Sequence, residues 1–225
     1  MPKTIKKVVK KSHKSENIGE TVTDLREKLQ EKQQTLVYSL FAFGVVLIAV
    51  VAFVVYSKVA DSKAQALQYE GYRLFHGDTL APSASPADQY KSALEKFKQS
   101  YEAKKSPVSL LYIADSCFAL GNYDEAIKTL KDLTARYSDP KISSLGYYKL
   151  SLAYVKKDDK DNALKTLATL AGLKDSPLQD MALLESAKLM ESMGKTAEAK
   201  AKYKELTDKF PKSILAVEAK AKLGG

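Results

Sequence analysis

The sequence predicts an all-α protein in which one transmembrane helix is followed by an α-solenoid, a stack of helix pairs closed by a C-terminal capping helix. Two observations predict this fold class. An uncharged apolar run covers residues 36–56, and a pattern of small and large side chains then recurs with offsets of 37 and 36 residues. The 225 residues include one Cys, two His and no Trp, which excludes an internal disulfide and cysteine-rich metal modules.

The apolar run is long enough to cross a membrane. Residues 36–56 read LVYSLFAFGVVLIAVVAFVVY, with Tyr38 and Tyr56 near the ends, where aromatic rings favour the membrane interface. A helix of this length spans about 30 Å, the thickness of a bilayer hydrocarbon core. A buried core helix and a cleavable signal peptide are the alternatives. Because a signal peptide has a shorter apolar region and a shorter polar start, we interpret the run as an uncleaved signal anchor.

The flanking charges predict the orientation of the anchor. Residues 1–36 contain nine Lys and Arg side chains, whereas residues 57–77 contain three. Positive charge favours the cytoplasmic side, so the N-terminus is predicted to be cytoplasmic and residues 58–225 to be exported. In a bacterium, this arrangement is a single-pass inner-membrane protein with a periplasmic C-terminal domain.

The net charge of +9 does not require nucleic acid. Residues 1–18 are predicted to be a disordered basic cytoplasmic tail, whose lysines act as a topology signal and contact anionic lipid of the bilayer. No aromatic side chain is interleaved with these lysines, so no nucleic-acid partner is expected. Residues 19–35 form a short amphipathic helix that either lies on lipid or pairs with a partner helix.

Beyond the anchor, one helical pattern repeats. A small residue is followed twelve positions later by an alanine and, four positions after that, by a large side chain. In two antiparallel helices, the small residues allow a close approach of the backbones and the large one fills the adjacent space. An earlier half-unit repeats the last two positions at Ala93 and Phe97. The three full sets are Ala114, Ala126 and Leu130; Ser151, Ala163 and Leu167; and Ala187, Ala199 and Tyr203.

The positions between the paired helices favour a sharp reversal. Gly121 and Gly194 suit a left-handed backbone, and Asp158 stands at the equivalent place in the second unit. Pro107, Pro140, Pro177 and Pro211 each follow the second helix of a pair, where a helix must stop.

These residues resemble the tetratricopeptide repeat. ALGNYDEAIKTL is similar to its turn and second helix, and the resemblance covers residues 86–211 in three full units and one preceding half. The second unit departs from the pattern, because it lacks the turn glycine and has Lys160 where Tyr123 stands in the first. The first solenoid helix is predicted over residues 59–75, and SILAVEAKAKL would form the cap.

The layout as a whole resembles the single-anchor periplasmic repeat proteins akin to the ancillary subunit of the Sec translocon. The shared features are the tail, the anchor, an Ala-rich helix with aromatics (SKAQALQYEGY) and degenerate repeats. A periplasmic cell-division coordinator family is the related possibility, although its trimeric coiled coil is lacking here.

The repeat resemblance implies a peptide-binding groove lined by the first helix of each pair. Family members that clamp a C-terminal carboxylate use Asn and basic residues there, but Asp115 and Leu152 stand where such an Asn is expected. The remaining mixture of aromatic and charged side chains suits extended or partly unfolded chains. The predicted groove residues are Leu111, Asp115, Phe118, Tyr148, Leu152, Lys156, Leu184, Lys188 and Glu191.

No motif indicates catalysis, a cofactor or a metal site. Cys117 falls in step with Tyr154 and Met190 on the first helices and is predicted to be a core residue. The acidic cluster of residues 158–161 lacks the Gly and the terminal Glu of an EF-hand. Nucleotide-binding and hydrolase motifs are also absent from the sequence.

The sequence therefore predicts a non-enzymatic, membrane-anchored protein–protein interaction scaffold. The expected partners are translocon subunits, periplasmic chaperones or unfolded exported chains, and the sequence leaves the oligomeric state open. The alternatives are a cell-envelope or cell-division scaffold and, with the opposite orientation, an organellar import receptor.

Overall fold

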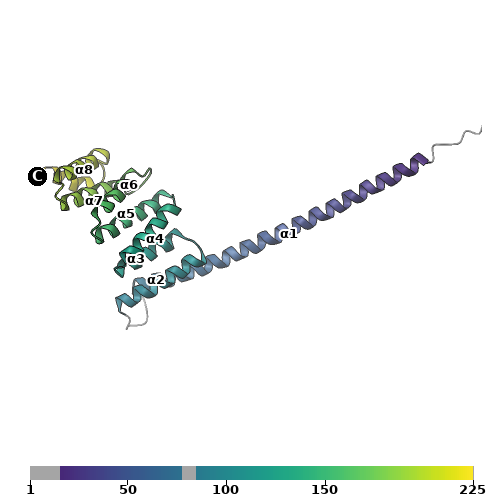
Figure 1. Ribbon diagram of the computed structural model, residues 1–225, viewed down its shortest axis with the longest axis horizontal. Helices are drawn as coiled ribbons and strands as arrows, with labels where there is room; N and C mark the ends of the chain where they lie inside the picture. Colours follow the sequence, from purple (N-terminus) through teal and green to yellow (C-terminus); the bar gives the residue numbers. More distant parts are fainter. Residues whose placement is uncertain (1–15, 78–84, 225) are drawn as a thin grey trace, which may run out of the picture. The chain divides into compact units, whose positions relative to one another are not determined.

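The computed structural model describes residues 16–77 and 85–224, and the predicted all-α class is confirmed within them (Figure 1). Most of the predicted tail (1–18) and residues 78–84, between the first two helices, lie outside the described residues. The helices are α1 Glu16–Phe75, α2 Pro86–Ala103, α3 Pro107–Ala119, α4 Tyr123–Arg136, α5 Pro140–Lys156, α6 Lys160–Gly172, α7 Gln179–Ser192, α8 Thr196–Lys209 and α9 Leu215–Gly224.

Helix α1 is continuous through three segments that the sequence suggests separately, 19–35, 36–56 and 59–75. The chain divides into two compact units, Met1–Lys58 and Val59–Gly225, and each is described by itself. In the first unit, the apolar side chains of the helix are exposed, Phe41 by 73% and Phe53 by 70%. Among the described residues, α1 is the helix long and apolar enough to cross a membrane.

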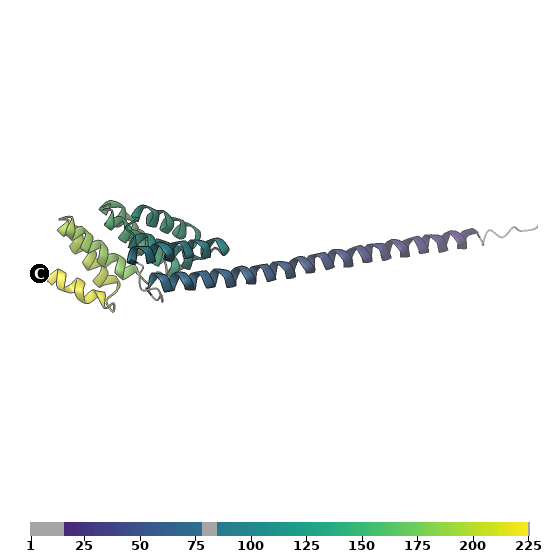
Figure 2. The same ribbon diagram turned by 90° about the horizontal axis from the view of Figure 1, so that it is seen from below.

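The second unit is a solenoid of antiparallel helix pairs (Figures 1 and 2). The last part of α1 packs on α2, where the Ser100 hydroxyl donates a hydrogen bond of 2.8 Å to the carbonyl of Ala64. The pairs α3–α4, α5–α6 and α7–α8 follow, and α9 packs on α8 and α7. Every small and large side chain of the predicted repeat is buried, namely Ala93, Phe97, Ala114, Ala126, Leu130, Ser151, Ala163, Leu167, Ala187, Ala199 and Tyr203.

The three turns inside the pairs share one geometry. Gly121, Asp158 and Gly194 have φ angles of 75°, 57° and 76°, so the predicted left-handed positions are confirmed. In each turn, the next residue donates its N–H to a carbonyl five positions earlier, at distances of 2.8, 2.9 and 2.9 Å. These are Schellman motifs, which pair carbonyls left over at the end of the first helix.

The residues that connect one helix pair to the next stop the preceding helix and also cap the start of the following one. Pro107 and Pro140 lie in the first turns of α3 and α5, where the missing N–H costs nothing and the fixed φ suits a helix. Just before them, Ser106 and Asp139 accept hydrogen bonds from backbone N–H groups of the first turn. Pro177 and Pro211 lie in the turns that precede α7 and α9.

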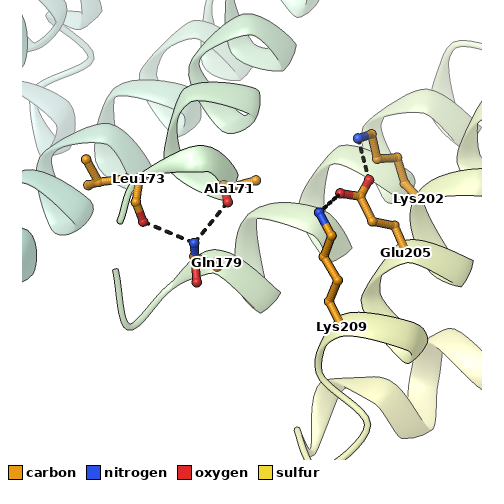
Figure 3. A network of polar contacts seen from close by, with 6 residues as sticks. All are labelled: Ala171, Leu173, Gln179, Lys202, Glu205 and Lys209. Atoms are coloured by element: carbon orange, nitrogen blue, oxygen red, sulfur yellow. Dashed lines mark hydrogen bonds and ion pairs between the residues drawn. The ribbon is translucent and has the colours of Figure 1, made fainter. Parts of the chain in front are cut away.

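Polar side chains also secure the last repeat (Figure 3). Gln179 at the start of α7 donates through Nε2 to the carbonyls of Ala171 and Leu173, both at 3.1 Å, and so ties the end of α6 to α7. On α8, the Glu205 carboxylate accepts bonds of 2.7 Å from Lys202 and from Lys209. These two bonds hold the pKa of Glu205 below its ordinary value.

The Glu205 carboxylate gives a pH-dependence prediction. A carboxyl with a lowered folded-state pKa stabilises the fold above its ordinary pKa of 4.5, and this contribution is lost as the pH falls through the lowered value. We expect Glu205→Gln to flatten the acid side of a melting-temperature profile recorded between about pH 3 and pH 6. Glu198→Gln, at an exposed position of the same helix, is the control. Equal acid profiles for the two variants would contradict the prediction.

Gly146 allows α4 and α5 to approach closely. An added Cβ would lie 2.5 Å from Cδ2 of the buried Leu133 and 2.8 Å from Cγ2 of Thr134, whereas Gly172, also helical, has open space around its Cα. Gly146→Ala gains helix propensity in the interior of α5, and Gly172→Ala, at the last residue of α6, is the control in which the added methyl group meets no neighbour. We expect Gly146→Ala to be about 1–3 kcal/mol less stable than Gly172→Ala in urea unfolding. Equal stabilities would show that Leu133 moves aside at no cost.

Candidate functional site

The first helices α3, α5 and α7 share one face of the solenoid. Asp115 on α3 and Lys149 on α5 form an ion pair of 2.6 Å across this face. Tyr148 on α5 lies near Glu185 and Lys188 on α7, and desolvation together with the Glu185 charge raises its pKa. These contacts link the first helices of three pairs along one surface, which we call the groove face.

The structure places the nine predicted groove residues in three groups. Asp115, Phe118, Tyr148 and Leu152 are half-buried, and Lys156 is exposed. Leu111 and Leu184 are only 8% and 2% exposed and belong to the hydrophobic core. Lys188 and Glu191 are half-buried beside the capping helix.

Sequence reasoning missed residues one position away from the two buried leucines. Tyr112, next to Leu111, is half-buried, and its ring stacks on Phe97 with centroids 4.7 Å apart and meets Tyr72 edge-on at 6.1 Å. Desolvation, followed by the neighbouring Tyr72 and Asp115, raises the Tyr112 pKa. Glu185, next to Leu184, is half-buried as well. The residue types could have indicated both positions, because a side chain with a polar group directly follows an apolar leucine at Tyr112 and at Glu185.

A small pocket opens on the groove face between α3 and α5. Its volume is about 80 Å³, and α4 contributes one side chain from below. The Asp115–Lys149 ion pair lies at its rim, and both side chains remain partly exposed, by 29% and 27%. The lining residues are Ala114, Asp115, Phe118, Leu130, Lys149 and Leu152.

At the C-terminal end of the groove face, charged side chains hold the capping helix. Lys188 contacts Glu218 of α9 at 2.9 Å, and Glu191 accepts hydrogen bonds of 3.0 Å from Lys222 of α9 and from the Tyr203 hydroxyl of α8. These bonds raise the pKa of Lys188 and lower that of Glu191. Lys188 and Glu191 therefore also serve to attach α9 in this structure.

The cysteine of α3 is held in an unreactive environment. Cys117 is fully buried on α3, and desolvation raises the pKa of its thiol to about 11, so it is protonated at neutral pH. Within the described ranges, no three His, Cys, Asp or Glu side chains cluster as a metal site would require. What the groove face offers is aromatic surface, paired charges and one pocket.

Comparisons with known proteins agree with the repeat geometry. Residues 181–213 match the family "Tetratricopeptide repeat", and residues 79–133 match "Anaphase-promoting complex, cyclosome, subunit 3". The first match covers the predicted third unit. Residues 181–213 therefore match a tetratricopeptide repeat, and such repeats indicate a protein–protein interaction scaffold. No curated protein sequence matches it significantly.

Solved structures resemble the solenoid at low sequence identity. Kinesin light chain TPR-like repeats from Podosopora anserina are 15% identical, with 72% of this chain and 84% of that chain covered and a TM-score of 0.55. MamA is 19% identical over 63% of this chain and 92% of that chain, with a TM-score of 0.47. The TPR2AB domain of yeast Sti1, in complex with pHSP90, is 20% identical over 72% and 71%, with a TM-score of 0.45. The P. anserina likeness supports the fold.

Proposed function

We propose that this protein is a non-enzymatic scaffold, anchored in a membrane by α1, that binds segments of other proteins on its groove face. The observation that carries the proposal is the combination, in one chain, of a helix with exposed apolar side chains and a solenoid with an open groove face. Neither feature needs a catalytic group. The groove face has the aromatic and balanced charged side chains that suit extended polypeptide.

The exposed side chains of α1 support the membrane anchor. Phe41 and Phe53 are more than two-thirds exposed, and leaving a large apolar side chain in water costs about 1.5–3 kcal/mol relative to burying it. A bilayer removes this cost along residues 36–56. The excess of lysine and arginine before the anchor supports a cytoplasmic N-terminus and a periplasmic repeat domain at a bacterial inner membrane.

With this orientation, the repeat domain meets proteins as they leave the Sec translocon. We propose translocon subunits, periplasmic chaperones and unfolded exported chains as its partners. A cell-envelope or cell-division scaffold is the alternative function, and accumulation at the septum would favour it. An organellar import receptor requires the reverse orientation, with the repeats in the cytosol.

Two measurements test the proposal. A protease added outside spheroplasts is expected to cleave a C-terminal tag, whereas protection of the tag would contradict the orientation. Affinity purification from detergent-solubilised membranes is expected to recover translocon subunits after crosslinking. The same purification is repeated with a variant that carries Tyr148→Ala and Leu152→Ala on the groove face. This variant should capture less of the exported chains than the wild type does. Consistent absence of translocon subunits from the wild-type eluate would contradict that partner assignment.

A further inference from the structure

We propose that the pocket between α3 and α5 is an anchor site for one aliphatic side chain of an uncharged, extended peptide segment. In this arrangement, Asp115 and Lys149 hydrogen-bond the peptide groups beside that side chain. The inference rests on the proposed function, because it assigns a ligand chemistry to part of the groove face. It specifies a branched aliphatic residue such as Val or Leu, inside a chain and not at its C-terminus.

The walls of the pocket determine which side chain it accepts. Ala114 and Leu130 form a buried apolar floor, and the half-buried Phe118 and Leu152 form its sides. Binding pockets are typically apolar with a few polar groups at defined positions, and this one has such a lining. An engineered cavity of about 150 Å³ accommodates benzene. At about 80 Å³, this pocket has room for a small aliphatic group but not for an aromatic ring.

The rim selects what lies beside the anchored side chain. A carboxylate has lone pairs for further hydrogen bonds and an ammonium group has three donors, so the Asp115–Lys149 pair retains both an acceptor and a donor. An extended peptide presents N–H and C=O groups that complement them. Because the charges of the pair already balance, a neutral segment fits better than a terminal carboxylate. Lys188, farther along the groove face, is likewise paired, with Glu218.

The inference is tested with host peptides of Gly, Ser and Asn that carry one central guest residue and blocked ends. Binding to the full chain in lipid nanodiscs is measured by fluorescence anisotropy, with empty nanodiscs subtracted. With Leu or Val as guest, we expect binding about 10- to 100-fold tighter than with Ala, because an aliphatic group fills the pocket. Phe and Glu guests should bind more weakly than Leu. Freeing the C-terminal carboxylate should not improve binding.

Variants of Leu152 test whether the preference for an aliphatic guest residue arises in this pocket. Leu152→Ala enlarges the pocket and should shift the preference from Leu towards Phe, while Leu152→Phe fills the pocket and should remove the preference. Leu164→Ala, at a half-buried leucine of α6, is the matched control and should keep the Leu preference. Asp115→Asn should weaken all peptides several-fold without changing their ranking. Melting curves check that each variant is folded.

The outcomes separate the two proposals. Binding of all guests with equal affinity would overturn the anchor pocket and leave the proposed function standing. A preference unchanged by both Leu152 variants would also overturn it, as would tighter binding of a free carboxylate. A dimer that peptides displace would assign the pocket to a second copy of the chain. Failure of every peptide, together with failure to capture exported chains, would contradict the proposed function itself.

Discussion

Replacing Phe97 with alanine is expected to lower the free energy of unfolding of the repeat domain by about 3–5 kcal/mol. The ring is fully buried on α2 and stacks on Tyr112 with an interplanar angle of 11°. It also fills the space above Gly71, where an added Cβ would lie 2.7 Å from the ring edge. Removal of the ring therefore opens a cavity shared by α1, α2 and α3.

In the Phe97→Ala variant, the loss of stability should be greatest at the N-terminal end of the solenoid, because each repeat is stabilised mainly by its neighbours. Urea unfolding followed by near-ultraviolet circular dichroism gives the total change. Hydrogen exchange should show the largest increase in residues 59–75 and in α2, with a smaller one in α7 to α9. Phe118→Ala, at a half-buried aromatic of the groove face, is the control and should cost less. Uniform faster exchange along all the helices would contradict the local account.

The buried pattern was predictable because it depends on contacts within one repeat. Ala126, Ala163 and Ala199 recur at nearly equal intervals, and each is fully buried. The left-handed turns were predictable for a similar reason: few residue types tolerate a positive φ, and Asp158 is one of those that do. Local chemistry at a repeated spacing therefore determined both features.

The groove face was less predictable because it depends on how successive pairs stack. Leu111 and Tyr112 are adjacent on α3, yet one lies in the core and the other on the groove face. A rotation of α3 about its axis by less than the angle between successive residues determines which of the two faces the core. The periodic pattern does not determine that rotation. The ion pair between Asp115 and Lys149 joins residues 34 positions apart. A search of the sequence for opposite charges about one repeat apart could have found this ion pair.

The attachment of α9 was also beyond the sequence pattern. Lys188 and Glu191 occupy the same helix face as groove residues of the earlier repeats, but here that face meets the cap. The face of the first helix therefore packs against α9 in the last repeat, whereas the corresponding face is open in the two repeats before it. The open part of the groove face lies over α3 and α5, where the pocket is.

Replacing Tyr203 with alanine should destabilise the C-terminal end of the solenoid by about 3–5 kcal/mol. Tyr203 is fully buried in the core formed by α7, α8 and α9, and its hydroxyl donates a hydrogen bond of 3.0 Å to Glu191. Desolvation and this carboxylate both raise the Tyr203 pKa, so the hydroxyl stays protonated and remains a donor. The alanine variant loses the ring and the donor together.

Tyr203→Phe separates the two contributions, because it keeps the ring and removes only the hydroxyl. We expect it to cost about 1 kcal/mol, the net value of a typical hydrogen bond. Its second effect concerns acid stability, since hydrogen bonds from Lys222 and from Tyr203 lower the Glu191 pKa. Without the tyrosine hydroxyl, that pKa rises towards its ordinary value, and less stability is lost on acidification. A Tyr203→Phe variant as unstable as Tyr203→Ala would show that the hydroxyl, and not the packing of the ring, holds α9 in place.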